Sequence, residues 1–111
     1  LIDLELLKTL TLGDDKLMQQ MLTTSQVENG KDLASAKEAA RIGDWAALQN
    51  HLHRINGSAQ ILGAAALLAL CEQLESHEPT QVPDPIIEEG LQQLTKQLTE
   101  LNDEIDLMYQ A

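Results

Sequence analysis

Aromatic residues are almost absent from this chain of 111 residues, which has no phenylalanine, one tryptophan and one tyrosine. Strands draw on aromatic and β-branched residues, whereas the apolar residues here are mostly leucine, isoleucine and alanine. This composition favours helices over strands. Proline is also rare: all three prolines lie within residues 76–85, which predicts one clear loop there.

Cysteine, positive charge and long apolar runs are scarce as well. The single cysteine, Cys71, cannot form an internal disulfide, and we expect it in the core. Seven basic against 18 acidic residues give a net charge of −11, which opposes binding to nucleic acid or anionic lipid. No apolar run approaches the roughly 20 residues that span a bilayer. Acidic residues within the first ten argue against a signal peptide, and the first residue is not Met, so we expect a piece of a longer protein.

What is present is the 3.6-residue period of amphipathic helices. The clearest apolar stripe consists of Ile87, Leu91, Leu94, Leu98, Leu101, Ile105 and Met108. Similar patterns predict helices over 14–41, 44–62 and 64–77, preceded by a short helix over about 2–10. The expected core residues of the helix over 14–41 are Leu17, Met21, Leu22, Leu33, Ala36 and Ala40. Those of the helix over 44–62 are Trp45, Leu48, Leu52, Ile55, Ala59 and Leu62. Those of the helix over 64–77 are Leu67, Leu70, Cys71 and Leu74.

The first long helix is weaker in its middle, where Glu-Asn-Gly at 28–30 predicts a kink or a break. Helices with one apolar stripe and short connections pack antiparallel. The sequence therefore predicts an all-α fold, an up-down antiparallel four-helix bundle with a short N-terminal helix, as a single domain over residues 1–111.

Two histidines lie two residues apart in the segment 44–62. On a helical wheel of 100° per residue, His53 lies roughly 130° from the centre of the apolar stripe and faces solvent. His51 lies roughly 70° from it, on the other flank, towards the edge of a neighbouring helix. Residues at i and i+2 do not share a face, whereas a two-histidine metal site on a helix needs i and i+4. We therefore predict no metal site.

Gly57 follows His53 by one turn on the same face. Glycine inside a helix costs roughly 1 kcal/mol relative to alanine, but here it leaves a gap through which another molecule can approach the ring. Amide and hydroxyl groups that border this face could hydrogen-bond a phosphoryl group; they belong to Gln49, Asn50, Asn56, Ser58 and Gln60. Geometry alone leaves open that His53 is an ordinary surface histidine.

Residues 53–64, HRINGSAQILGA, resemble the signature of histidine-containing phosphotransfer (Hpt) domains. The matching positions are His53, Gly57, Ser58, Ala59, Gly63 and Ala64. GDWAALQNHLH before the motif and LCEQLE at 70–75 also resemble the family, and the resemblance covers roughly 14–109. It departs at Asn56, where the family usually has lysine. Arg54 is cationic but points in another direction, so it replaces that charge only in part.

The resemblance implies a phosphorelay intermediate. His53 would accept a phosphoryl group from a receiver-domain aspartate and pass it to the aspartate of another receiver. Gln49, Asn50, Arg54, Asn56, Gly57, Ser58 and Gln60 would form the phosphate environment and docking surface. The chain would need no cofactor of its own, since the receiver brings Mg²⁺, and it has no nucleotide-binding loop for ATP. The sequence is similar to the C-terminal Hpt domains of bacterial hybrid sensor kinases. This similarity implies that the domain is cytoplasmic and monomeric. It also implies that its partners are the receiver domains of a sensor kinase and of a response regulator.

Two other functions fit parts of the pattern. One is an acidic helical interaction module in which His53 has no role. The other is the dimerisation domain of a histidine kinase, which also carries a histidine on a helical bundle. Such a domain is a two-helix hairpin and normally has an acidic residue directly after the histidine, whereas Arg54 stands there in this chain.

Overall fold

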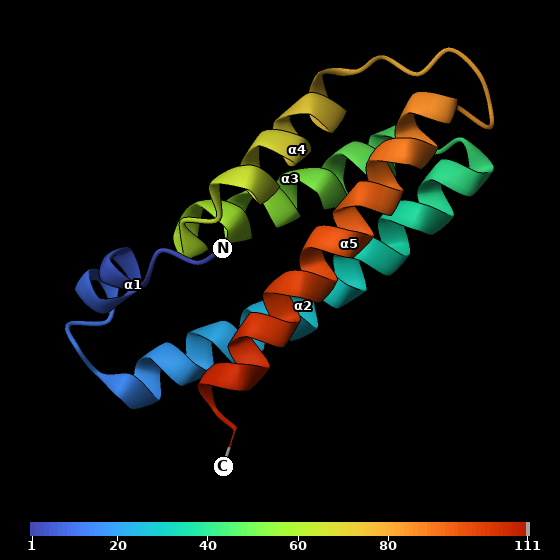
Figure 1. The fold of residues 1–111 in the computed structure, drawn as a ribbon. Coiled ribbons are helices and arrows are strands. Elements are labelled where there is room, and N and C mark those ends of the chain that lie inside the picture. Colours follow the sequence, from blue (N-terminus) through green and yellow to red (C-terminus); the bar gives the residue numbers. More distant parts are fainter. Residues whose placement is uncertain (111) are drawn as a thin grey trace.

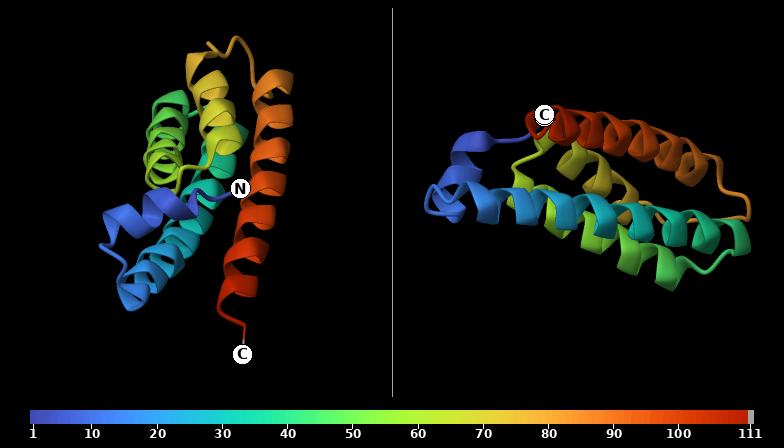
Figure 2. Two further views of the ribbon diagram at one scale, coloured as in Figure 1. Left: turned by 60° about the vertical axis from the view of Figure 1, so that its left-hand side comes forward. Right: turned by 90° about the horizontal axis from the view of Figure 1, so that it is seen from below.

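The computed structural model describes residues 1–110, which form five helices and no strand (Figure 1). The helices are α1 (Leu4–Leu10), α2 (Asp15–Ile42), α3 (Trp45–Leu62), α4 (Ala65–Ser76) and α5 (Pro85–Met108). Four of them form the predicted antiparallel bundle, in which α2 and α4 each pack against both α3 and α5. The short α1 lies at one end of the bundle, where it packs against α3 (Figure 2). The all-α prediction is therefore confirmed.

The helix ends follow from local sequence signals. Asp14, Asp44 and Asp84 precede α2, α3 and α5, and each carboxylate accepts a hydrogen bond from a backbone N–H of the first turn. Gly63 ends α3 with a φ of 64°, a left-handed conformation that favours glycine. A side chain there would also collide with Asp3, whose N–H donates to the carbonyl of Leu62 at 2.9 Å. Gly63 therefore both ends α3 and lets the start of α1 dock on that end.

The core contains most of the predicted apolar residues. Two predictions were wrong: 41% of Leu17 and 37% of Met108 are exposed. Met18, the next residue of α2, takes the buried position in place of Leu17. Met108 is the last residue of α5, one turn beyond Ile105, which is buried. The ends of a helix can extend beyond the helices packed against it. An apolar stripe identified from the sequence can therefore include terminal residues that lie outside the core.

Of the kink or break predicted at 28–30, the break was also wrong, because α2 is one continuous helix of 28 residues. The weak pattern has a tertiary cause. Asn29 is buried, and its side-chain amide donates to the hydroxyl of Ser58 on α3 at 3.1 Å. Asp32, one turn on, is buried as well. The polar residues that interrupt the apolar stripe of α2 thus face α3, and packing outweighs the low helix propensity of Asn29 and Gly30.

Candidate functional site

His53 stands near the middle of α3 with 80% of its side chain exposed. Its neighbours Leu52 and Ile55 are fully buried, so the helix face is fixed and the imidazole is held outwards, as the wheel predicted. One turn on, a Cβ placed on Gly57 would have no atom within 4 Å outside its own surroundings in the helix. The space beside the ring is therefore open to a second molecule.

A groove between α2 and α3 continues from this gap. It has a volume of about 340 Å³. Its lining residues are Thr24, Ser25, Glu28, Asn29, Asp32, Arg54, Gly57, Ser58 and Ile61. Ile61 lies one turn beyond Gly57 and is about half exposed, so an apolar side chain borders the polar groove. The surface beside His53 thus offers both polar and apolar contacts.

On the opposite side, His53 contacts α4. Its Nδ1 lies 3.2 Å from Oε1 of Glu75, whose other carboxylate oxygen accepts from the side-chain amide of Asn56 at 2.9 Å. The Asn56 carbonyl oxygen in turn accepts from the amide of Gln60 at 2.7 Å. A chain of hydrogen bonds therefore runs from Gln60 through Asn56 and Glu75 to the exposed imidazole.

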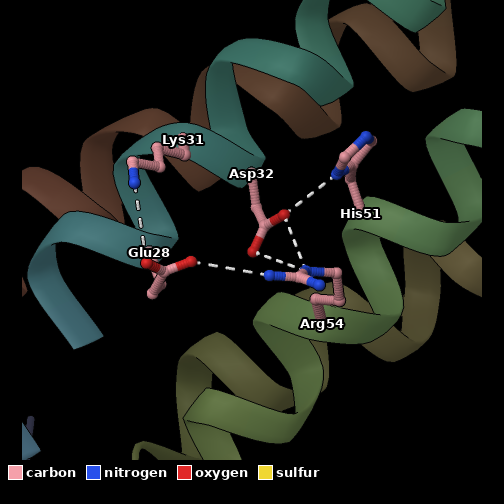
Figure 3. A network of polar contacts seen from close by, with 5 residues as sticks. All are labelled: Glu28, Lys31, Asp32, His51 and Arg54. Carbon is pink, nitrogen blue, oxygen red and sulfur yellow. Dashed lines mark hydrogen bonds and ion pairs between the residues drawn. The ribbon is translucent and has the colours of Figure 1, made fainter. Parts of the chain in front are cut away.

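His51 is held by a different cluster, on the α2 side (Figure 3). Its Nδ1 lies 2.9 Å from Oδ1 of the buried Asp32, which also accepts from Nε of Arg54 at 3.0 Å. Glu28 pairs with Arg54 at 3.5 Å and with Lys31 at 3.7 Å. The ring of His51 is thus tied to the α2–α3 interface, as its position on the wheel predicted.

The structure places the remaining predicted site residues as follows. Asn50 is exposed and Gln49 is half-buried on the N-terminal side of His53. Ser58 is half-buried, with its hydroxyl accepting from Asn29. The amide of Gln60 is directed towards Asn56. Of these four residues, Gln60 is connected to His53 by hydrogen bonds, through Asn56 and Glu75. Ser58 is bonded to α2 instead.

Two of the predicted site residues need correction. Asn56 was expected to border the exposed face, yet only 6% of it is exposed, because its amide packs against α4 and binds Glu75. Arg54 was expected to replace the usual lysine in part. Its guanidinium instead pairs with Asp32 and Glu28 of α2, on the side away from Glu75. Asn56 has no charge and the guanidinium of Arg54 is paired with α2, so neither residue provides a free positive charge to a group on His53.

Sequence reasoning missed Glu75, Asp32 and Glu28. Glu75 lies in the LCEQLE segment that carried part of the family resemblance, so its position was marked but its chemistry was not. Its contact with His53 joins residues 22 apart on different helices, which periodicity within one helix cannot reveal. Asp32 stands at a core-facing position of α2, and a charged residue there was a signal for a buried ion pair.

Cys71 provides no competing nucleophile. It is fully buried on α4, and burial, followed by the charges of Glu75 and Glu72, raises the pKa of its thiol to about 12. The thiolate is the reactive form of cysteine, so this side chain is inert at neutral pH. Among residues 1–110, no three histidine, cysteine or acidic side chains are grouped so that they could hold a metal ion.

Comparisons with known proteins identify relatives of the chain. The family model described as Hpt domain matches residues 20–108. The sensor protein EvgS of Escherichia coli strain K12 is 36% identical over 109 residues, and the match covers 98% of this chain and 9% of that protein. EvgS of Escherichia coli O157:H7 has the same identity and coverage. The chain therefore spans a small part of the relatives that it matches. No solved structure matches it.

Proposed function

The chain belongs to the histidine-containing phosphotransfer (Hpt) domain family, which passes phosphoryl groups along phosphorelays, and we propose that His53 is the residue that carries the group. The observation that carries this proposal is the 80% exposure of the His53 side chain beside the open space at Gly57. The family membership also disfavours an acidic interaction module without phosphotransfer. The five helices of residues 1–110 do not match the two-helix hairpin of a kinase dimerisation domain.

The transfer needs few groups on this chain. A ring nitrogen of His53 attacks the phosphorus of a receiver's aspartyl phosphate, a P–N bond forms, and the aspartate carboxylate leaves with the electron pair of the P–O bond. The carboxylate of a second receiver reverses these steps and takes the group. Phosphoryl transfer depends mainly on positioning and charge stabilisation. The receiver supplies Mg²⁺, and this chain supplies an exposed imidazole on a rigid helix.

We place the domain among these partners on three grounds. Its relatives are sensor proteins, which supports a receiver of a sensor kinase as donor and a response regulator as acceptor. The net charge of −11 disfavours nucleic acid, and no helix within residues 1–110 is long and apolar enough to cross a bilayer. The bundle covers its own core, which supports a monomer. A cytoplasmic location, where receivers act, completes the proposal.

The two histidines provide the decisive test. His53→Gln should abolish labelling by a phosphorylated receiver with Mg²⁺, because it removes the exposed nucleophile. His51→Gln should retain labelling, because its ring is directed towards Asp32 at the helix interface. Acid-labile phosphate on the protein would be measured, and far-UV circular dichroism would check that each variant folds. Label that survives in His53→Gln and disappears in His51→Gln would contradict the assignment.

A further inference from the structure

Arg54 follows His53 directly in the sequence and lines the groove between α2 and α3. Of the residues within 1–110 that line this groove, Arg54 alone is basic, and 55% of its side chain is exposed. We propose that Arg54 is a docking and specificity residue, whose guanidinium binds a carboxylate on the receiver that approaches His53. The inference rests on the proposed function, in which His53 exchanges a phosphoryl group with a receiver.

A buried carboxylate holds the guanidinium in place (Figure 3). Nε of Arg54 lies 3.0 Å from Oδ1 and 3.2 Å from Oδ2 of Asp32, and only 5% of Asp32 is exposed. Hydrogen bonds between two charged groups are stronger than those between neutral groups, and this one ties the side chain to α2. Asp32 also binds His51, so its carboxylate is held from two sides. Asp32 therefore keeps the cation of Arg54 at the edge of the groove.

The other end of the guanidinium is available to a partner. Nη2 of Arg54 pairs with Glu28 at 3.5 Å, and about half of each side chain is exposed, so this contact is weak. Nη1 donates no hydrogen bond within residues 1–110. Two N–H groups of a guanidinium match the two oxygens of a carboxylate. The Nη1–Nη2 edge can therefore bind a carboxylate of a second protein while Nε stays bound to Asp32.

The charges on the two surfaces favour such a contact. A receiver holds Mg²⁺ beside its phosphoryl group, and carboxylates bind Mg²⁺ in sites of this kind, so the face that approaches His53 carries acidic groups. This chain has a net charge of −11, and Glu28, Asp32 and Glu75 lie around the histidine. Like charges oppose docking. A fixed cation next to His53 offsets that repulsion and selects receivers that place a carboxylate opposite it.

Arg54→Gln removes the charge but keeps a long polar side chain. The concentration of a phosphorylated receiver that gives half the maximal transfer rate should rise about tenfold, near the lower end of the coupling between close interfacial charges. The maximal rate should not change, because the imidazole of His53 is intact. Lys37→Gln on α2 is the matched control, since it makes the same change in net charge outside the groove.

An unchanged half-saturating concentration in Arg54→Gln would overturn the role of Arg54. The receiver used is one that labels the wild-type protein. If His53→Gln abolishes labelling by that receiver, the assignment of His53 stands whatever Arg54→Gln does. The two proposals can therefore fail separately.

A second substitution separates docking from stability. Arg54→Gln leaves the buried carboxylate of Asp32 with His51 as its partner, so the bundle should become less stable. In Asp32→Asn combined with Arg54→Gln the buried charge is removed as well. The free energy of unfolding should then recover, while docking stays weak. A double variant that docks like the wild type would show that Arg54 only balances Asp32, and would overturn the proposal.

Charge reversal identifies the carboxylate on the receiver. Asp32→Asn combined with Arg54→Glu should dock more weakly than the double variant with glutamine, because one carboxylate would face another. Lysine is then substituted in turn for each acidic residue of the receiver other than its Mg²⁺ ligands and its phosphorylated aspartate. One of these substitutions should restore docking of the glutamate variant and weaken docking of the wild type. If none does, a direct ion pair with Arg54 is ruled out.

Discussion

At the scale of single residues, the site depends on the absence of a side chain at Gly57 as well as on the imidazole of His53. Gly57 lies in a regular turn of α3, with a conformation that any residue could adopt. Nothing lies within 4 Å of where its Cβ would be, so packing does not require glycine there either. The stability that alanine would add, roughly 1 kcal/mol, is forgone at the position next to His53. We explain this lost stability by function: without a side chain at position 57, a partner protein can approach the imidazole of His53.

Gly57→Leu should therefore separate stability from function. We expect the free energy of unfolding to rise by up to about 1 kcal/mol, since leucine is a better helix former. Phosphoryl transfer should slow, because the new side chain fills the space beside the imidazole. Gly30→Leu on α2 is the matched control, since its Cβ position is also open and the residue is exposed. Denaturant unfolding and receiver labelling give the two readouts. Normal transfer in Gly57→Leu would argue against docking over this gap.

The sequence predicted the orientation of each histidine, but not what each one touches. The stripe that contains Leu52 and Ile55 fixes the buried direction of α3, and positions relative to that direction follow from helix geometry. The contacts with Glu75 and Asp32 depend on how α3 sits against α4 and α2, and the residues involved are 22 and 19 apart. Periodicity carries no information on the register between helices.

At the scale of helices, the same limit explains which features were predictable. The stripe of α5 identified a long helix because its apolar residues serve one continuous core. The pattern of α2 was misread at 28–30, since Asn29 is buried for a partner, Ser58, on another helix. Close approaches between helices were invisible to the sequence as well. One of these is at Gly90 of α5, where a Cβ would overlap the side chain of Leu74 on α4.

Gly90→Ala should destabilise the bundle, although alanine favours helix formation. The added methyl group would meet Cδ2 of Leu74 and lie 3.0 Å from its Cγ, and Leu74 is buried, so either its side chain must repack or α4 and α5 must move apart. Overpacking of a core costs about 1–3 kcal/mol, which exceeds the gain of roughly 1 kcal/mol in helix propensity. Gly30→Ala, where no atom is near, should show the gain alone. Unfolding in urea would compare the two, and a more stable Gly90→Ala protein would contradict this packing.

At the scale of the whole molecule, the connection from α4 to α5 closes the bundle, and one aspartate organises it. Oδ1 of Asp84 accepts from the N–H groups of Ile86 at 2.9 Å and Ile87 at 3.3 Å, which begin α5. Oδ2 lies 3.0 Å from Nε2 of His77 and accepts from the N–H of Thr80 at 3.3 Å. The hydrogen bond with His77, followed by those from the backbone, holds the pKa of the Asp84 carboxyl below its ordinary value against the opposing effect of burial.

This lowered pKa predicts how the stability of the molecule depends on pH. A carboxyl whose pKa is lower in the folded state stabilises the fold above its unfolded pKa, about 3.9, and this contribution disappears as the pH falls through the folded pKa. Asp84→Asn retains a capping side chain but has one acceptor oxygen instead of two, so it should melt at a lower temperature at neutral pH. The difference in melting temperature between the wild type and this variant should be largest above about pH 5 and shrink below about pH 4. Asp44→Asn is the control, because that carboxylate caps α3 through Ala47 without a histidine partner. A difference for Asp84→Asn that stays constant down to about pH 3 would mean that its charge does not hold the connection between α4 and α5.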